Sequence, residues 1–353
     1  MSDDARPLAI TMGEPAGIGT EVLLKAYRQL ADMPPGTAPV FFLVDDPARV
    51  EKIVRLIGLD LRLATIEAPG DAGAVFQGAL PVLPLTHGVS SALLHVQPGA
   101  PSGATAEAVT GSIRQAVSLV LEGAAGGVVT LPIHKKVLQD TGFAHPGHTE
   151  YLGALTGETG LPKGLVRGPV MMLAAGRFRV VPVTVHLPLR AVPDALSADR
   201  IVRAGVVTAQ ALRRDFGVRQ PRLAVTGLNP HAGEGGAMGT EERDVIAPAI
   251  EALREQRIDA QGPFPADTLF HEEARSAYDA ALCMYHDQAL VPIKTLAFHE
   301  AANVTLGLPI VRTSPDHGTA LEIAGRGVAN PASLLSAIGL CARMAARRAQ
   351  AAA

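Results

Sequence analysis

The chain has 353 residues, of which 48% are hydrophobic and 18% are charged, and this composition indicates one or two globular domains and not a disordered protein. A net charge of −3 and an aromatic content of 4% provide neither the basic patch nor the stacking residues of a nucleic-acid-binding protein. Two cysteines argue against a disulfide framework. The polar amino terminus, with no apolar run near the ~20 residues of a membrane span, predicts a cytoplasmic protein without a membrane partner.

The first half of the chain alternates short apolar runs with amphipathic patterns. We expect strands at 8–12, 39–44, 61–65 and 127–131, helices at 20–30, 47–57 and 104–122, and irregular chain at 68–102. Strands that alternate with helices are typical of βαβ units and of an α/β fold with a mostly parallel sheet. After the first strand, Gly13, Gly17 and Gly19 form either a tight turn or an anion site at a helix amino terminus.

Two further helix starts carry polar side chains. Lys135 and Lys136 follow the strand at 127–131, and lysines at such a position usually form a solvated helix face. His148 and Thr149 begin the next helical pattern. A threonine there is most often an N-cap, but its hydroxyl, the imidazole and the free backbone N–H groups can also hold a phosphate.

In the second half, two strands at 170–173 and 178–185 are expected to form a hairpin. The elements expected after it are helices at 198–216, 240–255 and 331–349, strands at 223–226 and 280–284, and a loop at 261–270 that carries Asp267. His186, His231 and His286 each follow an apolar strand, and strand ends of a parallel sheet meet at one edge. The three imidazoles are therefore either unrelated or the ligands of one divalent cation, which would keep an open position for catalysis.

The stretch 278–325 is unusual because polar side chains lie between Val, Leu and Ile residues. Asp287 follows His286 directly, and Lys294, Asn303 and Arg312 come next in apolar surroundings. Buried polar groups need partners, which are other side chains, a metal or a ligand. This stretch therefore predicts half of a binding site.

Several blocks of the sequence resemble the 4-hydroxythreonine-4-phosphate dehydrogenases of vitamin B6 biosynthesis. They are "TMGEPAGIGTE", "GHTEYL", "TVHLPL", "GLNPHAGEGG", "GPFPADTLF", "YHDQALVPIK" and "NVTLGLPIVRTSPDHGTALEIAG", and they run in order almost from end to end of the chain. The resemblance implies a two-domain α/β fold similar to the isocitrate and isopropylmalate dehydrogenases. It also implies a homodimer that uses NAD or NADP and a divalent metal ion (Zn, Mg or Co). Such an enzyme oxidises the C3 hydroxyl of 4-phosphooxy-L-threonine, and the product then loses carbon dioxide.

The resemblance also implies roles for individual residues. The metal ligands are His186, His231 and His286, in a site shared across the dimer interface, and the residues that bind the phosphorylated substrate are His148, Thr149, Lys294, Asn303 and Arg312. Asp267 and Asp287 are expected to orient the imidazoles. The hydroxyl proton goes to a metal-bound water, to Lys294 or to an aspartate. Gly233, Gly235 and Gly236 form either a cofactor loop or only a turn.

We expect an outer domain of residues 1–125 and 300–353 and an inner domain of residues 126–299 that carries the histidines. The chain departs from the family pattern at Thr20, at His134 and at His299-Glu300, close to Asn303. The alternative functions are a paralogue acting on erythronate or threonate 4-phosphate, a dehydrogenase of a cis-dihydrodiol dicarboxylate, and a non-catalytic metal- or phosphate-binding protein. The "GHTE" block argues against the second, and the full set of histidines with Lys294, Asn303 and Arg312 argues against the third.

Overall fold

The computed structural model describes residues 6–352, which divide into two compact units. Unit 1 contains the chain up to Thr159 together with Pro309–Ala346, and unit 2 contains Gly160–Leu308 and the residues from Arg347 onward. In both the predicted and the observed division, the chain leaves the first part and returns to it near the carboxyl terminus. The predicted boundaries near 125 and 300, as limits of independently folding domains, stay a prediction.

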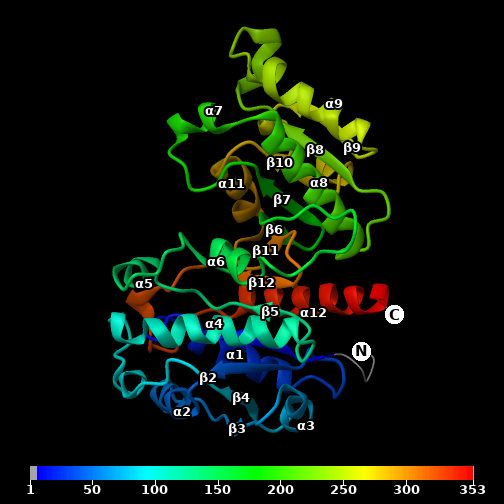
Figure 1. The fold of residues 1–353 in the computed structure, drawn as a ribbon. Coiled ribbons are helices and arrows are strands. Elements are labelled where there is room, and N and C mark those ends of the chain that lie inside the picture. Colours follow the sequence, from blue (N-terminus) through cyan, green and yellow to red (C-terminus); the bar gives the residue numbers. More distant parts are fainter. Residues whose placement is uncertain (1–5, 353) are drawn as a thin grey trace. The chain divides into compact units, whose positions relative to one another are not determined.

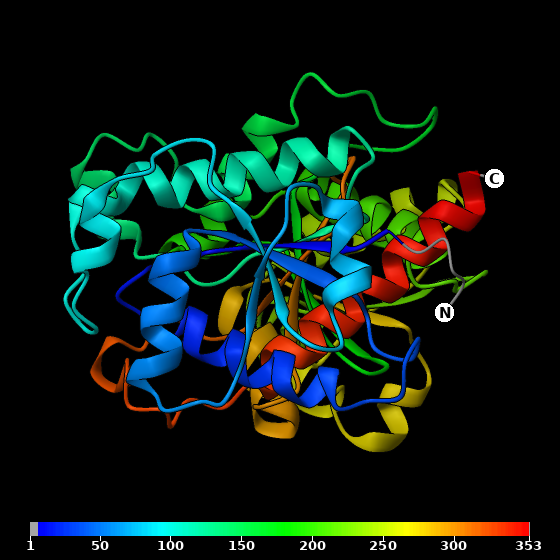
Figure 2. The ribbon, with the colours of Figure 1, turned by 90° about the horizontal axis from the view of Figure 1, so that it is seen from below.

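Unit 1 is a parallel sheet with helices on both faces. Its strand order is β3-β4-β2-β1-β5-β12, and every neighbouring pair is parallel. The strands are β1 Leu8–Thr11, β2 Phe41–Asp45, β3 Leu63–Thr65, β4 Leu80–Pro84, β5 Val128–Val129 and β12 Arg312–Pro315. The helices are α1 Gly19–Ala31, α2 Pro47–Leu56, α3 Ala72–Val75, α4 Ala106–Leu121, α5 Lys135–Asp140, α6 His148–Leu155 and α12 Ala332–Ala352. Helix α4 covers one face and α1 and α12 the other (Figure 2), so β1 and β2 are buried at every position.

Unit 2 contains a mixed sheet with the order β11-β6-β7-β10-β8-β9 (Figure 1). The strands are β6 Val170–Ala175, β7 Phe178–Pro182, β8 Arg222–Thr226, β9 Asp259–Phe264, β10 Ala280–Cys283 and β11 Ala302–Leu306. The helices are α7 Val192–Ala195, α8 Ala198–Arg214, α9 Ala247–Glu255, α10 Glu272–Ser276 and α11 His286–Ala297. The predicted hairpin of β6 and β7 is confirmed, β6 is also antiparallel to β11, and the other pairs are parallel. The predicted α/β class with a mostly parallel arrangement is therefore confirmed.

Two local predictions are wrong. The segment 68–102, predicted to be irregular, contains strand β4, which pairs between β2 and β3. The loop predicted at 261–270 begins as the edge strand β9, parallel to β8, and only then becomes the turn Ala266–Thr268. The helix predicted at 240–255 is confirmed; its first turn, Glu242–Ile246, is π-helical, and α9 follows it.

The core of unit 2 fixes the start of helix α11. Ala289 and Ile293 of α11 pack in one cluster with Val180 of β7 and with Ala281 and Cys283 of β10, and all five are buried. Fully burying a Val or Ile side chain stabilises the fold by about 1.5–3 kcal/mol. The burial of Ile293 therefore holds the helix firmly on its sheet. Among residues 6–352, no helix has both the length and the hydropathy needed to cross a membrane.

Candidate active site

His286 opens helix α11 just beyond the carboxyl end of the buried strand β10. Its Nδ1 atom lies 2.7 Å from Oδ1 of Asp287. A carboxylate at one ring nitrogen fixes the tautomer and orientation of an imidazole and leaves the other nitrogen available for a metal ion. The carboxylate of Asp287 therefore contacts the imidazole of His286, and its role in orienting a metal-bound ring stays a prediction.

A second histidine lies beside the first. Strand β7 ends at Pro182, and the chain beyond it is held by Thr184, whose Oγ1 donates to the carbonyl of Met284 at 2.7 Å. His186 itself has a φ of 42°, in the left-handed region that residues other than glycine rarely adopt. The ring centroids of His186 and His286 are 5.7 Å apart. With metal–nitrogen bonds of about 2.1 Å, two rings that share one ion have centroids roughly 5–6 Å apart, so this pair fits a divalent cation.

The third predicted ligand, His231, lies in a loop after β8. Its side chain is 64% exposed, and its Nδ1 atom is 3.4 Å from Oε2 of Glu234. Within residues 6–352, no group of three or more His, Cys, Asp or Glu side chains is placed to hold a metal ion. One chain therefore brings His186 and His286 together but does not assemble all three predicted ligands.

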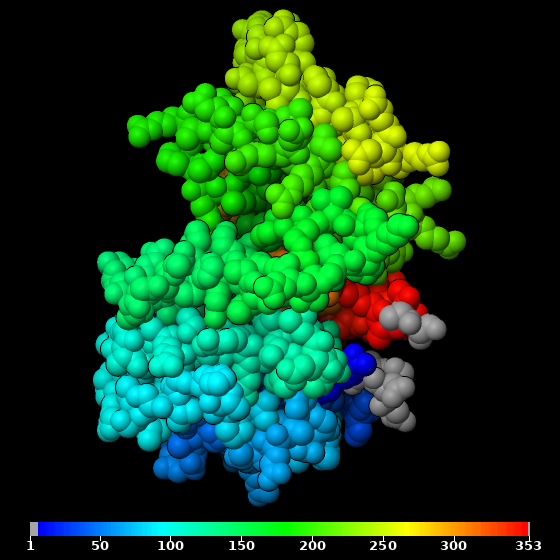
Figure 3. Space-filling model, in the orientation of Figure 1, coloured from blue at the N-terminus to red at the C-terminus, as the bar shows by residue number. Residues whose placement is uncertain are grey.

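The loop Pro230–Gly236 contains Gly233, Gly235 and Gly236. Residues 231–235 all have left-handed φ angles, between 42° and 80°. The base of the loop is closed by Glu242, whose Oε1 accepts hydrogen bonds of 2.7 Å from the backbone N–H groups of Leu228 and Asn229. Beside Gly235 the space is open, since a Cβ there would meet nothing within 4 Å. The yellow-green segment after β8 projects from the surface of unit 2 (Figure 3).

The remaining predicted residues of unit 2 lie on three different elements. Lys294 is on α11, about two turns beyond His286, with its Nζ atom 5.8 Å from the ring centroid of Phe298. Asn303 is half-buried on β11. Asp267 lies in the turn after β9, which is adjacent to the His231 loop.

In unit 1, Arg312 is the first residue of β12 and is only 3% exposed. Its Nε and Nη2 atoms donate to Oγ1 of Thr130 at 3.1 and 2.6 Å. Burial lowers the pKa of Arg312 to about 10, so the guanidinium still carries its charge at neutral pH. The side chain is thus a fixed cation whose direction is set by a threonine that follows β5.

His148 and Thr149 form the first turn of α6 and are both half-buried. The Nε2 atom of His148 is shielded from solvent and has no hydrogen-bond partner among the described residues. Burial, and then the charges of Arg312 and Lys135, hold the pKa of His148 well below its ordinary value of 6.5. The imidazole is therefore neutral at pH 7, and its Nε2 atom is available to a ligand together with the free N–H groups of the helix start.

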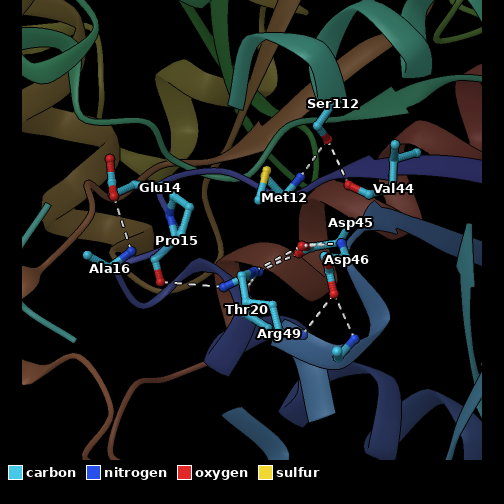
Figure 4. A network of polar contacts seen from close by, with 11 residues as sticks. Met12, Glu14, Pro15, Ala16, Thr20, Val44, Asp45, Asp46, Arg49 and Ser112 are labelled. Carbon is cyan, nitrogen blue, oxygen red and sulfur yellow. Dashed lines mark hydrogen bonds and ion pairs between the residues drawn. The ribbon is translucent and has the colours of Figure 1, made fainter. Parts of the chain in front are cut away.

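The glycine-rich turn between β1 and α1 is occupied by the protein's own groups (Figure 4). Arg49 forms a buried ion pair with Asp45, and its Nη2 atom donates to Oγ1 of Thr20 at 2.7 Å. The Oε1 atom of Glu14 accepts the backbone N–H of Ala16 at 3.1 Å, and burial raises the pKa of this carboxyl. These contacts favour a tight turn over an anion site, and they give Thr20 a structural role.

Two residues near the predicted site had no assigned role. Thr130 orients Arg312 through its hydroxyl, and Lys135 lies close enough to His148 to affect its pKa. Thr130 lies inside the strand predicted at 127–131, whereas the observed strand β5 ends at Val129, so the sequence carried no signal for its contact with Arg312. For Lys135, the sequence predicts only a lysine on the solvated face of a helix start.

The chain is similar to proteins of one family over nearly its whole length. A family model described as pyridoxal phosphate biosynthetic protein PdxA matches residues 37–341. A 4-hydroxythreonine-4-phosphate dehydrogenase of Methylorubrum populi is 54% identical over 98% of this chain and 97% of its own. The crystal structure of 4-hydroxythreonine-4-phosphate dehydrogenase from Klebsiella pneumoniae is 35% identical, with a TM-score of 0.83, and covers 98% of this chain and 99% of its own. A terephthalate 1,2-cis-dihydrodiol dehydrogenase from Burkholderia xenovorans follows at 27% identity and a TM-score of 0.60, over 96% of this chain and 98% of its own. The chain therefore belongs to the PdxA family of pyridoxal phosphate biosynthetic proteins.

Proposed function

We propose that the protein oxidises the C3 hydroxyl of 4-phosphooxy-L-threonine with NAD or NADP, and that the product loses carbon dioxide to give 3-amino-2-oxopropyl phosphate. The observation that carries this proposal is the 54% identity, over 98% of the chain, to a relative named for this substrate. A cytoplasmic location belongs to the same proposal.

The side chains proposed to bind the substrate are the five assigned to it from the sequence. Arg312, His148 and Thr149 offer the phosphate a buried cation, a neutral imidazole and a helix start. Lys294 is proposed to contribute a point charge, and Asn303 a donor and an acceptor that fix the orientation of the substrate.

A divalent cation suits the paired imidazoles of His186 and His286, with Asp287 holding one ring. When bound, it supplies Lewis-acid polarisation of the reacting oxygen. Because one chain does not assemble three ligands, we propose that His231 completes the set across a homodimer interface. Since Asp287 is engaged with His286, Lys294 and Asp267 are the remaining side chains for the hydroxyl proton.

Two surfaces of unit 2 are proposed to bind the cofactor and the partner subunit. The open space beside Gly235, with Gly233 and Gly236 next to it, allows a nicotinamide cofactor to approach the backbone closely. Large apolar side chains are exposed just after His186, on α11 and directly after α11: Leu187, Leu189, Val291, Leu296 and Phe298. We propose that the partner subunit covers them, since exposed apolar patches often mark protein–protein contacts.

The test is formation of NADH by purified, zinc-loaded protein, with 4-phosphooxy-threonine and erythronate 4-phosphate compared at equal concentration. Preference for the amino-bearing substrate is the expected result. Preference for erythronate 4-phosphate would instead identify the protein as the paralogous dehydrogenase of that sugar acid. The exposed His299 and Glu300, just before β11, offer contacts for such a substrate. Light scattering tests the dimer independently.

A further inference from the structure

One lysine beside the proposed phosphate site forms no ion pair and no hydrogen bond with any described residue. Lys135 opens the short helix α5, next to Lys136. The Nζ atom of Lys136 forms an ion pair with Oδ2 of Asp140 at 3.0 Å. Within residues 6–352, Lys135 forms neither a hydrogen bond nor an ion pair. Lys136 fits the expected solvated face of the helix. A solvated face does not explain the direction of the Lys135 side chain.

The side chain of Lys135 lies against the start of helix α6. A Cβ built on Gly147, the N-cap of α6, would lie 3.3 Å from Cε and 3.5 Å from Nζ of Lys135. The same ammonium, together with Arg312, acts electrostatically on the imidazole of His148. Two cations from different elements therefore converge on one neutral histidine and on the free N–H groups of a helix start.

This arrangement favours an anion. The Nε2 atom of His148 is shielded and has no hydrogen-bond partner in the described part of the chain, which costs free energy unless a ligand supplies the missing hydrogen bond. Oε2 of Glu150, which would also lie 3.5 Å from a Cβ on Gly147, is the nearby carboxylate, and its residue is exposed. One exposed carboxylate does not neutralise two cations and a helix start, whereas a phosphate monoester with a charge near −2 does.

We propose that Lys135 is a phosphate-binding residue, whose ammonium completes, with Arg312, His148 and the start of α6, a recess for the dianionic phosphate of the substrate. The identity of the ester rests on the proposed function, whereas the recess for an anion does not. Lys135 contributes a point charge where Arg312 contributes a fixed fork, so the two bind different oxygens of the same group.

The test compares Lys135→Gln with the matched control Lys136→Gln, which removes the neighbouring charge from the same helix. Inorganic phosphate binding is measured by calorimetry on the whole protein, and KM and kcat are measured with 4-phosphooxy-threonine. Lys135→Gln is expected to weaken phosphate binding and to raise KM roughly 10- to 100-fold with kcat nearly unchanged, the loss typical of one charged hydrogen bond. Lys135→Arg is expected to restore most of the affinity, and Lys136→Gln is expected to match the unaltered protein.

Equal phosphate affinity in the two glutamine variants would overturn the role of Lys135, even if turnover with 4-phosphooxy-threonine is normal. If the protein instead does not turn over that substrate but loses phosphate binding only in Lys135→Gln, the recess stands and the proposed function fails. The two ideas are thus separated by one pair of measurements.

Discussion

Replacing Asp287 tests whether the carboxylate beside His286 supports a metal ion. The 2.7 Å contact between its Oδ1 and Nδ1 of His286 is of the kind whose loss weakens metal binding by about 10- to 100-fold. The Asp287 side chain is 76% exposed, so solvent screens its charge. An asparagine keeps an acceptor oxygen there and loses only the charge. We therefore expect zinc affinity to fall about tenfold, or about 1.4 kcal/mol, in Asp287→Asn and by nearer to 100-fold in Asp287→Ala.

The measurement is zinc affinity by competition with a chromophoric chelator at fixed pH. Asp140→Asn is the control, because its carboxylate is also largely exposed but pairs with Lys136 in unit 1. Circular dichroism confirms that each variant is folded. Zinc affinities that are the same in Asp287→Asn, Asp287→Ala and the control would refute the orienting role of Asp287, and with it the reasoning that His286 is held for a metal.

Four further predictions concern other parts of the chain. Arg312→Ala should raise KM by a factor that corresponds to about 1.5–3 kcal/mol, with a much smaller change in kcat; equal losses in both would contradict a role in binding alone. His231→Ala should lose bound zinc and show a lower kcat while its circular dichroism stays unchanged. Normal turnover of this variant after chelator treatment would contradict a role of His231 as a metal ligand. Thr20→Pro removes the hydroxyl that accepts from Arg49 and should lower the free energy of unfolding in urea by about 1 kcal/mol, whereas Thr20→Ser should not. Because the folded pKa of His148 is depressed, the unfolded chain binds more protons below about pH 6.5, so stability should fall there and should fall less in His148→Gln; parallel pH profiles would contradict this.

Periodicity and apolar runs were sufficient to predict most of the sheet, because buried parallel strands leave continuous Val, Leu and Ile runs. They failed at β11 and β12, for which no strand was predicted. They also failed at β4 and β9, where prolines look like strand breakers. In β4 the sequence "LPVLP" contains Pro81 and Pro84, and in β9 Pro263 follows Gly262. Strand partners, which no single segment contains, override the local preference in both places.

The site was predictable only where a side chain sits directly at the end of a strand. His286 satisfies that condition, whereas Arg312 is the first residue of β12, a strand that the apolar runs did not predict. The contact of His186 with His286 and the separate position of His231 depend on left-handed residues in loops, and no pattern of residue types specifies those paths. The orientation of Lys135 toward α6 depends on the fold of residues 141–147, which the sequence alone also leaves open.

The burial of Cys283 protects its thiol from alkylation and oxidation. This thiol ends the strand that precedes His286, it is 0% exposed, and burial raises its pKa, so the reactive thiolate is scarce. A soft sulfur atom close to imidazoles could otherwise capture a thiophilic ion or be oxidised. Enclosed in the core between β7 and α11, it is inert to alkylating reagents and to peroxide as long as the unit is folded. Slow alkylation of Cys283 would thus report local opening of the strand that leads to His286.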